Sequence, residues 1–230
     1  MSKLKKIKKD IKNRYFDGHA RKAYSQEGED LVLKRIFGRK RNGFYVDVGA
    51  HHPQRFSNTY FFYKQGWRGI NIDAMPGSMK EFDRTRPEDI NIEQPIADIK
   101  TVLTYYAFNE PALNTFFKEL AEERDGKNGF HIAFTKDIET TTLEAILDQH
   151  LPTGKTIDFL SIDVEGLDFN ILKSNNWEKY KPVVILIEIA DKGLREILDS
   201  EIVRYLESLG YEAFSKTVNT VVFKRKDAAI

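Results

Sequence analysis

The stretch Phe44-Tyr45-Val46-Asp47-Val48-Gly49-Ala50 decides the fold, because an apolar strand in it stops abruptly at a glycine. Small residues at a strand end let the backbone turn sharply and approach a ligand closely. An aromatic-rich helix follows, then a second strand at residues 68–73 and a third near residues 90–92. Strands that alternate with helices in this way predict an α/β domain built on a parallel sheet.

The later part of the chain extends this sheet. A strand at residues 157–162 leads into Asp163-Val164-Glu165-Gly166, and residues 183–189 form the most apolar strand, which is typical of a buried central position. We expect one helix over residues 194–209 and a closing antiparallel pair of strands within residues 211–223. The prediction is therefore a mostly parallel sheet with an antiparallel pair at its C-terminal end.

Residues 99–142 interrupt the regular alternation of strands and helices. Residues 102–108 have the pattern of a strand, whereas residues 119–129 are polar and are expected to be irregular or helical. We interpret residues 99–142 as an insertion over the edge of the sheet, within a single domain that covers residues 23–230. Insertions of this kind commonly form pockets or lids for a substrate.

Composition excludes several classes of protein. The chain has 230 residues, 41% of them hydrophobic, which suits one folded domain. The 36 basic residues are nearly balanced by 35 acidic ones, so the net charge does not indicate a nucleic-acid-binding protein. The absence of cysteine excludes disulfides, thiolate catalysis and thiolate metal sites. No apolar run approaches the roughly 20 residues that span a bilayer, and the basic N-terminus lacks a signal-peptide core, so we expect a cytoplasmic protein.

Residues 1–22 are strongly basic and are predicted to form a helix. Leu4, Ile7, Ile11 and Tyr15 recur at helical spacing, with lysines on the opposite side. The favoured interpretation is a surface helix that packs this stripe on the domain. The alternative is peripheral contact with an anionic membrane, or with an anionic substrate, through the basic side.

Acidic and small residues follow three successive predicted strands. Asp47, Gly49 and Ala50 end the first, Asp73 ends the second, and Ala97-Asp98 follow the third. In doubly wound folds the ligand lies across these carboxyl ends, and an acidic residue after the second strand accepts ribose hydroxyls. Each aspartate alone fits an ordinary turn residue. Their ordered recurrence favours an adenosine-containing ligand, with Asp98 placed to reach the adenine amino group.

The residues after Gly49 separate two candidate ligands. A dinucleotide requires the pattern G-x-G-x-x-G, which brings a pyrophosphate against a helix N-terminus. This chain has Ala50-His51-His52-Pro53 instead, and bulky residues with a proline make a poor phosphate cradle. S-adenosylmethionine contains no phosphate, so the sequence favours it over NAD.

Three motifs together resemble the FkbM family of methyltransferases: Tyr24-Ser25-Gln26 with Gly28 and Asp30, Phe44 to His51, and Ile162-Asp163-Val164-Glu165-Gly166. The resemblance covers about residues 24–189. It implies a Rossmann-like fold with a seven-stranded sheet, S-adenosylmethionine as methyl donor, and O-methylation of sugars or related hydroxylated metabolites. It also places Asp47 and Gly49 beside the methionine part of the donor and Asp73 beside its ribose. A role for Gln26, covering the donor or orienting the acceptor, rests mostly on the same resemblance.

Asp163 and Glu165 are the main candidates for the chemistry. Methyl transfer to an alcohol requires in-line positioning and a base that takes the hydroxyl proton. We predict that Asp163 faces the donor methyl group or the acceptor, and that Glu165 is a base or an acceptor-binding carboxylate. In the alternative interpretation, both carboxylates cap the N-terminus of the next helix. His51 and His52 are further candidate bases beside the crevice, or hydrogen-bonding loop residues.

A metal site and other functions are alternatives to this hypothesis. Asp163, Glu165 and Glu188 offer oxygen ligands suited to magnesium, but no tight ligand motif demands a metal, so metal-free catalysis is favoured. The expected acceptor is a sugar, a nucleotide-linked sugar or another glycan precursor, with residues 99–142 on its side of the site. The alternatives are a non-catalytic module that binds S-adenosylmethionine or a partner, an NAD-linked enzyme, and a nucleic-acid methyltransferase. Lysines clustered at the N-terminus, and not around the pocket, disfavour the last.

Overall fold

The structure is a computed structural model that describes residues 5, 7–8, 19–110, 113–164, 166–189 and 192–228. Its centre is a seven-stranded sheet in the order β3-β2-β1-β6-β7-β9-β8. The strands are β1 (Phe44–Val48), β2 (Arg68–Asp73), β3 (Ile90–Glu93), β6 (Phe159–Ile162), β7 (Val184–Glu188), β8 (Tyr211–Lys216) and β9 (Thr220–Arg225). Strands β3, β2, β1, β6 and β7 are parallel, and β9 and β8 close the sheet antiparallel. The predicted mostly parallel, Rossmann-like sheet is therefore confirmed.

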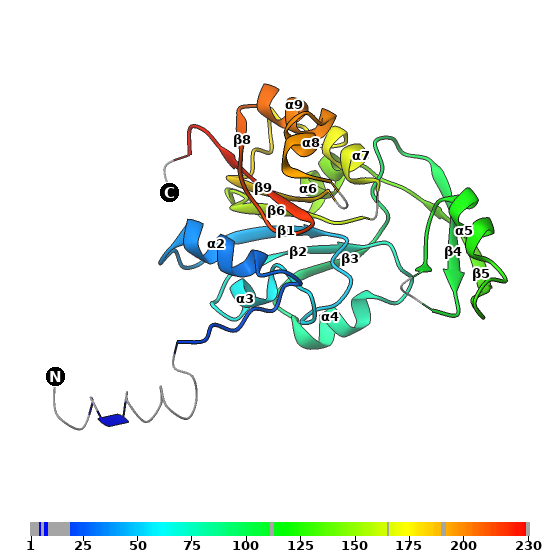
Figure 1. The fold of residues 1–230 in the computed structure, drawn as a ribbon, viewed down its shortest axis with the longest axis horizontal. Helices are drawn as coiled ribbons and strands as arrows, with labels where there is room; N and C mark the ends of the chain where they lie inside the picture. The colour runs from blue at the N-terminus through cyan, green and yellow to red at the C-terminus, as the bar shows by residue number, and fades with distance from the viewer. Residues whose placement is uncertain are drawn as a thin grey trace.

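Helices cover both faces of the sheet (Figure 1). One face packs against α6 (Leu143–His150), α7 (Asp168–Lys173), α8 (Leu194–Leu198) and α9 (Glu201–Ser208). The other face lies under α2 (Glu29–Phe37), α3 (Tyr60–Tyr63) and α4 (Met79–Thr85). Because successive side chains of a strand point to opposite faces, Val46 of β1 enters the first core while Tyr45 enters the second. Asp47 consequently points toward the α3 side.

The order of the strands fixes where a ligand can bind. Strand β1 lies between β2 and β6, and the chain leaves β1 toward β2 on one side and returns through β6 on the other. This reversal of strand order opens a crevice at the carboxyl ends of β1 and β6.

The insertion forms a lobe of its own beside the main sheet (Figure 1). It contains β4 (Val102–Phe108) and β5 (Ile132–Glu139), paired antiparallel, and α5 (Lys118–Arg124). The lobe is tied back to the main body by an isolated bridge between Ile96 and Thr141. Strand β4 was predicted, whereas β5 was not, because nearly all of its side chains are exposed and give little core-facing pattern.

The C-terminal helices and the N-terminal segment differ from the sequence expectation or lie mostly outside the described residues. The single helix expected over residues 194–209 is wrong: Asp199 and Ser200 separate α8 from α9, and the Ser200 side chain accepts a hydrogen bond from the Val203 amide and starts a new helix. Most of the basic helix predicted for residues 1–22 lies outside the described residues. Within the described part of the chain, no helix combines the length and apolar character needed to cross a bilayer.

Candidate active site

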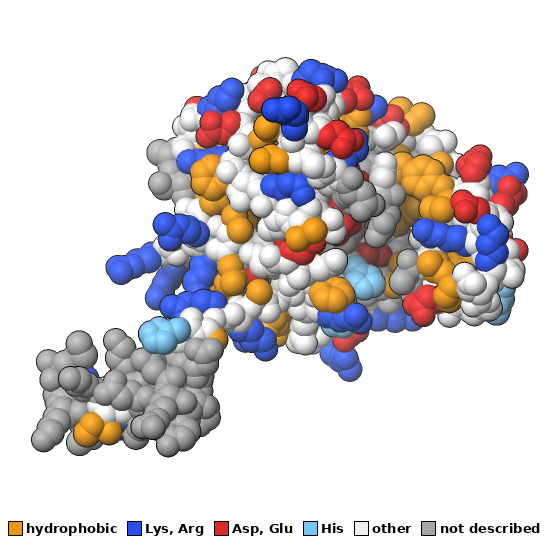
Figure 2. Space-filling view, viewed as in Figure 1, with side chains coloured by type: hydrophobic (Ala, Val, Ile, Leu, Met, Phe, Trp, Pro, Cys, Tyr) orange, Lys and Arg blue, Asp and Glu red, His pale blue; other side chains and the backbone are white. Residues whose placement is uncertain are grey.

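A cavity of about 450 Å³ opens at the carboxyl ends of β1, β2 and β6, against the β4–β5 lobe. Figure 2 shows a recess between the body and this lobe, with a histidine side chain at its edge. Its walls come from segments that are distant in the sequence, at residues 26–27, 29, 47, 49–51, 56–58, 73–75, 95–96, 103, 105, 114–117, 161, 163–164, 167, 188 and 219–220. The crevice expected from the strand order is thus the site where the predicted residues meet.

Gly49 makes the turn that opens the cavity. Its φ is 82°, and a Cβ atom there would lie 1.7 Å from the carbonyl oxygen of Asp163. The amides of Gly49 and Ala50 both donate to the Ile72 carbonyl, at 2.9 and 3.0 Å, so the turn is anchored on β2. Only glycine allows the backbone after β1 to pass this close to the backbone after β6.

Asp73 is held in a fixed orientation at the end of β2. One carboxylate oxygen accepts from the His51 amide at 2.9 Å, and the other accepts from the Met75 amide at 2.8 Å. Each oxygen keeps acceptor capacity, because an ionised carboxylate has about four lone-pair sites. His51 adopts a φ of 50°, an uncommon conformation for a non-glycine residue, and its amide thereby meets Asp73.

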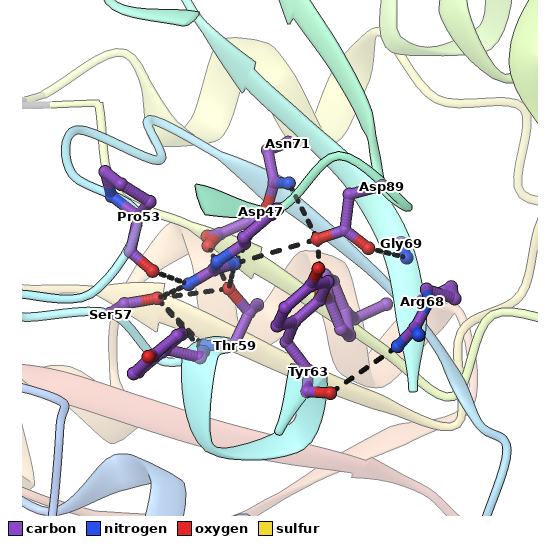
Figure 3. A network of polar contacts seen from close by, with 12 residues as sticks. Asp47, Pro53, Ser57, Thr59, Tyr63, Arg68, Gly69, Asn71 and Asp89 are labelled. Atoms are coloured by element: carbon purple, nitrogen blue, oxygen red, sulfur yellow. Dashed lines mark hydrogen bonds and ion pairs between the residues drawn. The ribbon is translucent and has the colours of Figure 1, made fainter. Parts of the chain in front are cut away.

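Asp47 is a buried residue of the cavity lining and joins a polar network (Figure 3). The Thr59 hydroxyl donates to its carboxylate at 2.8 Å, and the same Thr59 oxygen accepts from Arg86 at 2.7 Å. Burial raises the pKa of Asp47, while the Thr59 hydrogen bond and the nearby Arg86 charge oppose that rise. Asp47 therefore supports the loop after β1 in addition to lining the cavity.

Arg86 is the fully buried cation of this network. Its guanidinium donates to the Pro53 carbonyl and, at 2.7 Å, to the Ser57 hydroxyl. It also lies 3.9 Å from Asp89, whose carboxylate accepts from the Tyr45 hydroxyl and the Gly69 amide. Sequence reasoning missed Arg86, because an arginine at the end of a polar helix carries no sign that its partners Pro53 and Thr59 lie 33 and 27 residues earlier in the chain.

The loop after β6 is arranged around Asp168. Its buried carboxylate accepts from the Val164 amide at 3.2 Å and from the Gly166 amide at 3.1 Å. Burial raises the pKa of Asp168 to about 6, the two amide bonds oppose the rise, and the Glu188 charge adds to it. Asp168 thus holds the described backbone of this loop on the Val164 and Gly166 sides.

The segment before α2 is held against the turn between β8 and β9. The Asn219 amide donates to Glu27 at 2.8 Å, and the Thr217 hydroxyl donates to Glu29 at 2.9 Å. An isolated bridge also joins Ser25 to Phe56 in the loop after β1. These contacts place Gln26 and both glutamates along the wall of the cavity.

Acidic side chains dominate the charge of the cavity lining. Six carboxylates line the cavity, and no lysine or arginine of the described residues does so. The six are Glu27, Glu29, Asp47, Asp73, Asp163 and Glu188. The surroundings therefore favour a ligand with positive charge or many hydroxyl donors, and disfavour one that carries phosphate.

The cavity gathers most of the residues predicted from the sequence. Those on its lining are Gln26, Asp47, Gly49, Ala50, His51, Asp73 and Asp163. Ala97 and Asp98 are not among them, because the chain after β3 reaches the cavity at Pro95 and Ile96, and Asp98 is exposed. His52 is also absent from the lining; its ring nitrogen accepts from the Gln54 and Arg55 amides. Glu165 lies outside the described residues.

Among the described residues, no three histidine or carboxylate side chains are grouped closely enough to hold a metal ion. Of the magnesium ligands considered from the sequence, Asp163 and Glu188 both line the cavity. Glu188 was otherwise missed as a lining residue, although its place at the end of the most apolar strand was visible in the sequence.

One solved structure shares the fold of this chain at low sequence identity. A search of curated proteins found no match. A crystal structure of an FkbM methyltransferase from Methylobacillus flagellatus KT shares the fold, with a TM-score of 0.51 and 13% identity. The match covers 87% of this chain and 48% of that one, so the chain spans about half the length of that protein. A TehB-like SAM-dependent methyltransferase from Corynebacterium glutamicum ATCC 13032 Kitasato has a TM-score of 0.42 and 11% identity, over 98% of this chain and 100% of that one.

A family profile described as a methyltransferase FkbM domain matches residues 47–213, from the first aspartate of the cavity to the middle of β8. The matched range includes the strand ends of β1, β2, β6 and β7 and the whole insertion. The chain therefore belongs to the FkbM family of methyltransferases.

Proposed function

We propose that the protein transfers a methyl group from S-adenosylmethionine to a hydroxyl of a sugar or sugar-containing metabolite. The observation that carries this proposal is the charge of the cavity, which has six carboxylates and no described lysine or arginine on its lining. S-adenosylmethionine has a sulfonium and an ammonium group and no phosphate. NAD, by contrast, would place a pyrophosphate among carboxylates and beside a turn without a glycine-rich cradle.

The cavity residues fit the donor in a definite order. Asp73 is held by two backbone amides, and its remaining acceptor capacity suits the two ribose hydroxyls. The turn at Gly49 lets the donor approach the backbone closely, next to Asp163. The methionine half then extends toward the carboxylates before α2 and after β6. When bound, S-adenosylmethionine supplies the electrophilic methyl carbon.

The residues of this chain supply positioning and a proton acceptor. As the acceptor oxygen bonds to the methyl carbon, the carbon–sulfur bond breaks and the acceptor hydroxyl loses its proton. We assign the proton to the Asp163 carboxylate, which is exposed to the cavity beside the Gly49 turn. His51, also on the lining, is the second candidate base. Glu165, which lies outside the described residues, is the acceptor-binding carboxylate in this proposal.

The acceptor we propose is uncharged and rich in hydroxyls. Hydroxyl groups donate hydrogen bonds to carboxylates, whereas a phosphorylated acceptor would be repelled by them. Phe117 of the insertion lies near Gly166, so the lobe adds an apolar surface opposite the Asp163 loop. An apolar ring face beside carboxylates suits a sugar, which has both apolar and hydroxyl-bearing faces.

Calorimetry tests the donor. We expect S-adenosylmethionine and S-adenosylhomocysteine to bind and NAD not to bind. Asp73→Asn should weaken S-adenosylhomocysteine about tenfold, because an amide accepts fewer hydrogen bonds from the ribose. Asp98→Asn, an exposed aspartate after the next strand, is the matched control and also tests the adenine contact predicted from the sequence. Binding of NAD alone would refute the proposal.

Labelled donor and a screen of free sugars, glycosides and nucleotide sugars, read by mass spectrometry, test the acceptor. We expect Asp163→Asn to lower kcat much more than it lowers donor affinity, because the base acts in the transition state. Turnover should also survive excess chelator, in keeping with a carboxylate base. Methylation confined to phosphorylated acceptors, or donor binding with no turnover on any hydroxylated compound, would contradict O-methylation of sugars.

A further inference from the structure

Tyr105 of β4 is a buried side chain on the cavity wall. Only 3% of it is exposed, and it is part of the cavity lining together with Asp73 and Met75. Its ring packs on Phe116 of the same lobe, with centroids 5.2 Å apart. The insertion therefore brings a phenol next to the end of β2, the strand end where we place the ribose.

The hydroxyl of Tyr105 makes no hydrogen bond to any described residue. Its neighbour Asn114 is engaged elsewhere: its oxygen accepts from the Phe108 amide at 2.8 Å, and its nitrogen donates to the Met75 sulfur at 3.6 Å. A buried hydroxyl without a partner is costly and rare in folded proteins. On the wall of a ligand cavity, the missing partner is naturally a ligand atom.

The hydroxyl is a hydrogen-bond donor at neutral pH. Burial raises the pKa of Tyr105 to about 12, the negative charge of Asp73 adds to the rise, and the neighbouring Asn114 side chain opposes it. Repulsion between a phenolate and the Asp73 carboxylate is thereby avoided. A neutral phenol can donate its proton, so an acceptor atom of a ligand bound beside Asp73 would satisfy it.

We propose that Tyr105 is a donor-binding residue, whose hydroxyl donates a hydrogen bond to an oxygen or nitrogen atom in the adenosine half of the methyl donor. The assignment rests on the proposed function and gives the insertion a role in donor binding. Tyr105 contacts the donor near Asp73, while Phe117 lies toward Gly166 and the acceptor loop. The β4–β5 lobe thus spans both halves of the cavity.

The test compares Tyr105→Phe with Tyr106→Phe. Tyr106 is the next residue of the same strand, is not part of the cavity lining, and pairs through its backbone with Thr115. Calorimetry with S-adenosylhomocysteine and with 5′-methylthioadenosine measures the affinity of each variant. We expect Tyr105→Phe to lose about tenfold in affinity for both ligands, since both contain adenosine, and Tyr106→Phe to lose none.

Stability of the ligand-free protein supplies a second readout. Because the hydroxyl has no described partner, Tyr105→Phe should melt at the same temperature as the wild type or above it. A lower melting temperature would indicate a structural hydrogen bond and overturn the assignment. Equal affinity of Tyr105→Phe and wild type for both ligands would also overturn it, and so would a loss confined to S-adenosylhomocysteine. A wild-type protein that binds neither ligand would overturn the proposed function as well.

Discussion

At the residue scale, the absence of a side chain at Gly49 allows the backbone to pass close to Asp163. The backbone after β1 passes the Asp163 carbonyl at a distance that leaves no space for a methyl group. The sequence predicted this glycine, because its place after an apolar strand is a local signal. It could not predict which segment the glycine would face, since residue 163 follows a strand that pairs with β1 only in the folded sheet.

Gly49→Ala should destabilise the protein by more than about 3 kcal/mol, because it adds a clash with backbone to an unfavourable positive φ. Gly154→Ala is the matched control: Gly154 has a similar φ of 76°, but a Cβ atom there meets nothing within 4 Å. The control should lower the free energy of unfolding by only about 1–2 kcal/mol, because its only penalty is the positive φ. Urea unfolding of the two variants measures the difference, and equal losses would contradict a close contact between Gly49 and Asp163.

Asp168 gives a prediction on pH. Its pKa is raised to about 6 in the folded protein, so the folded state binds this proton more tightly than the unfolded state does. For this group, stability is lowest above about pH 6 and rises as the pH falls from there toward the ordinary aspartate value, by on the order of 2–3 kcal/mol. Asp168→Asn removes the titration. The difference in free energy of unfolding between wild type and variant should therefore change across this window, and a constant difference would argue against the raised pKa.

The network around Arg86 belongs to the scale of elements, since it joins the end of α4 to β2, the start of α3 and the loop after β1. Asp47, Asn71 and Asp89 come from or follow different elements and meet around one guanidinium (Figure 3). Each of these polar residues alone has the appearance of a turn or surface residue in the sequence. Their roles arise from packing between elements, which local patterns do not encode.

Arg86→Met should destabilise the protein by about 3–5 kcal/mol, because it leaves the buried Asp89 carboxylate without its cation and removes the bonds to Pro53 and Ser57. Arg84→Met, two residues earlier and exposed, loses only a surface ion pair with Glu81 and should change stability by less than about 0.5 kcal/mol. Thermal and urea unfolding measure both. A small effect of Arg86→Met would show that the loop after β1 is held by other contacts.

Secondary structure was predictable from the sequence to the extent that it faces the core. Apolar strands such as β1 and β7 are visible as buried runs, and their parallel arrangement follows from the helices between them. The division between α8 and α9 has a local signal in Ser200, a good N-cap residue, which the periodicity of the apolar residues on both sides obscured. Strand β5 is mostly exposed and therefore lacked such a signal.

At the scale of the whole molecule, the distribution of charge matters more than its sum. The chain is nearly neutral, with a formal net charge of +1, yet its cavity is lined by carboxylates and by no described lysine or arginine. The overall composition could not predict this contrast, because it depends on which strand ends face one another. The individual aspartates at those strand ends were predicted, since each follows an apolar strand.

The charge of the cavity should make donor binding depend on salt. Between about 0.1 M and about 1 M salt the screening length falls from about 10 Å to about 3 Å. The affinity for S-adenosylmethionine should fall about threefold more than the affinity for S-adenosylhomocysteine, which lacks the methyl group and the sulfonium charge. Calorimetry across a salt series measures the ratio, and a ratio independent of salt would mean that the carboxylates do not attract the sulfonium.

The contacts of Glu27 and Glu29 have a consequence for the order of events during synthesis. These two residues leave the ribosome early, yet their partners Asn219 and Thr217 are separated from them by 192 and 188 positions. Contacts between such remote positions form late, because a long stretch of chain must first be ordered. A nascent chain that already has β1, β2 and β6 would still lack one wall of its cavity, so the cavity is complete only once β8 and β9 have paired.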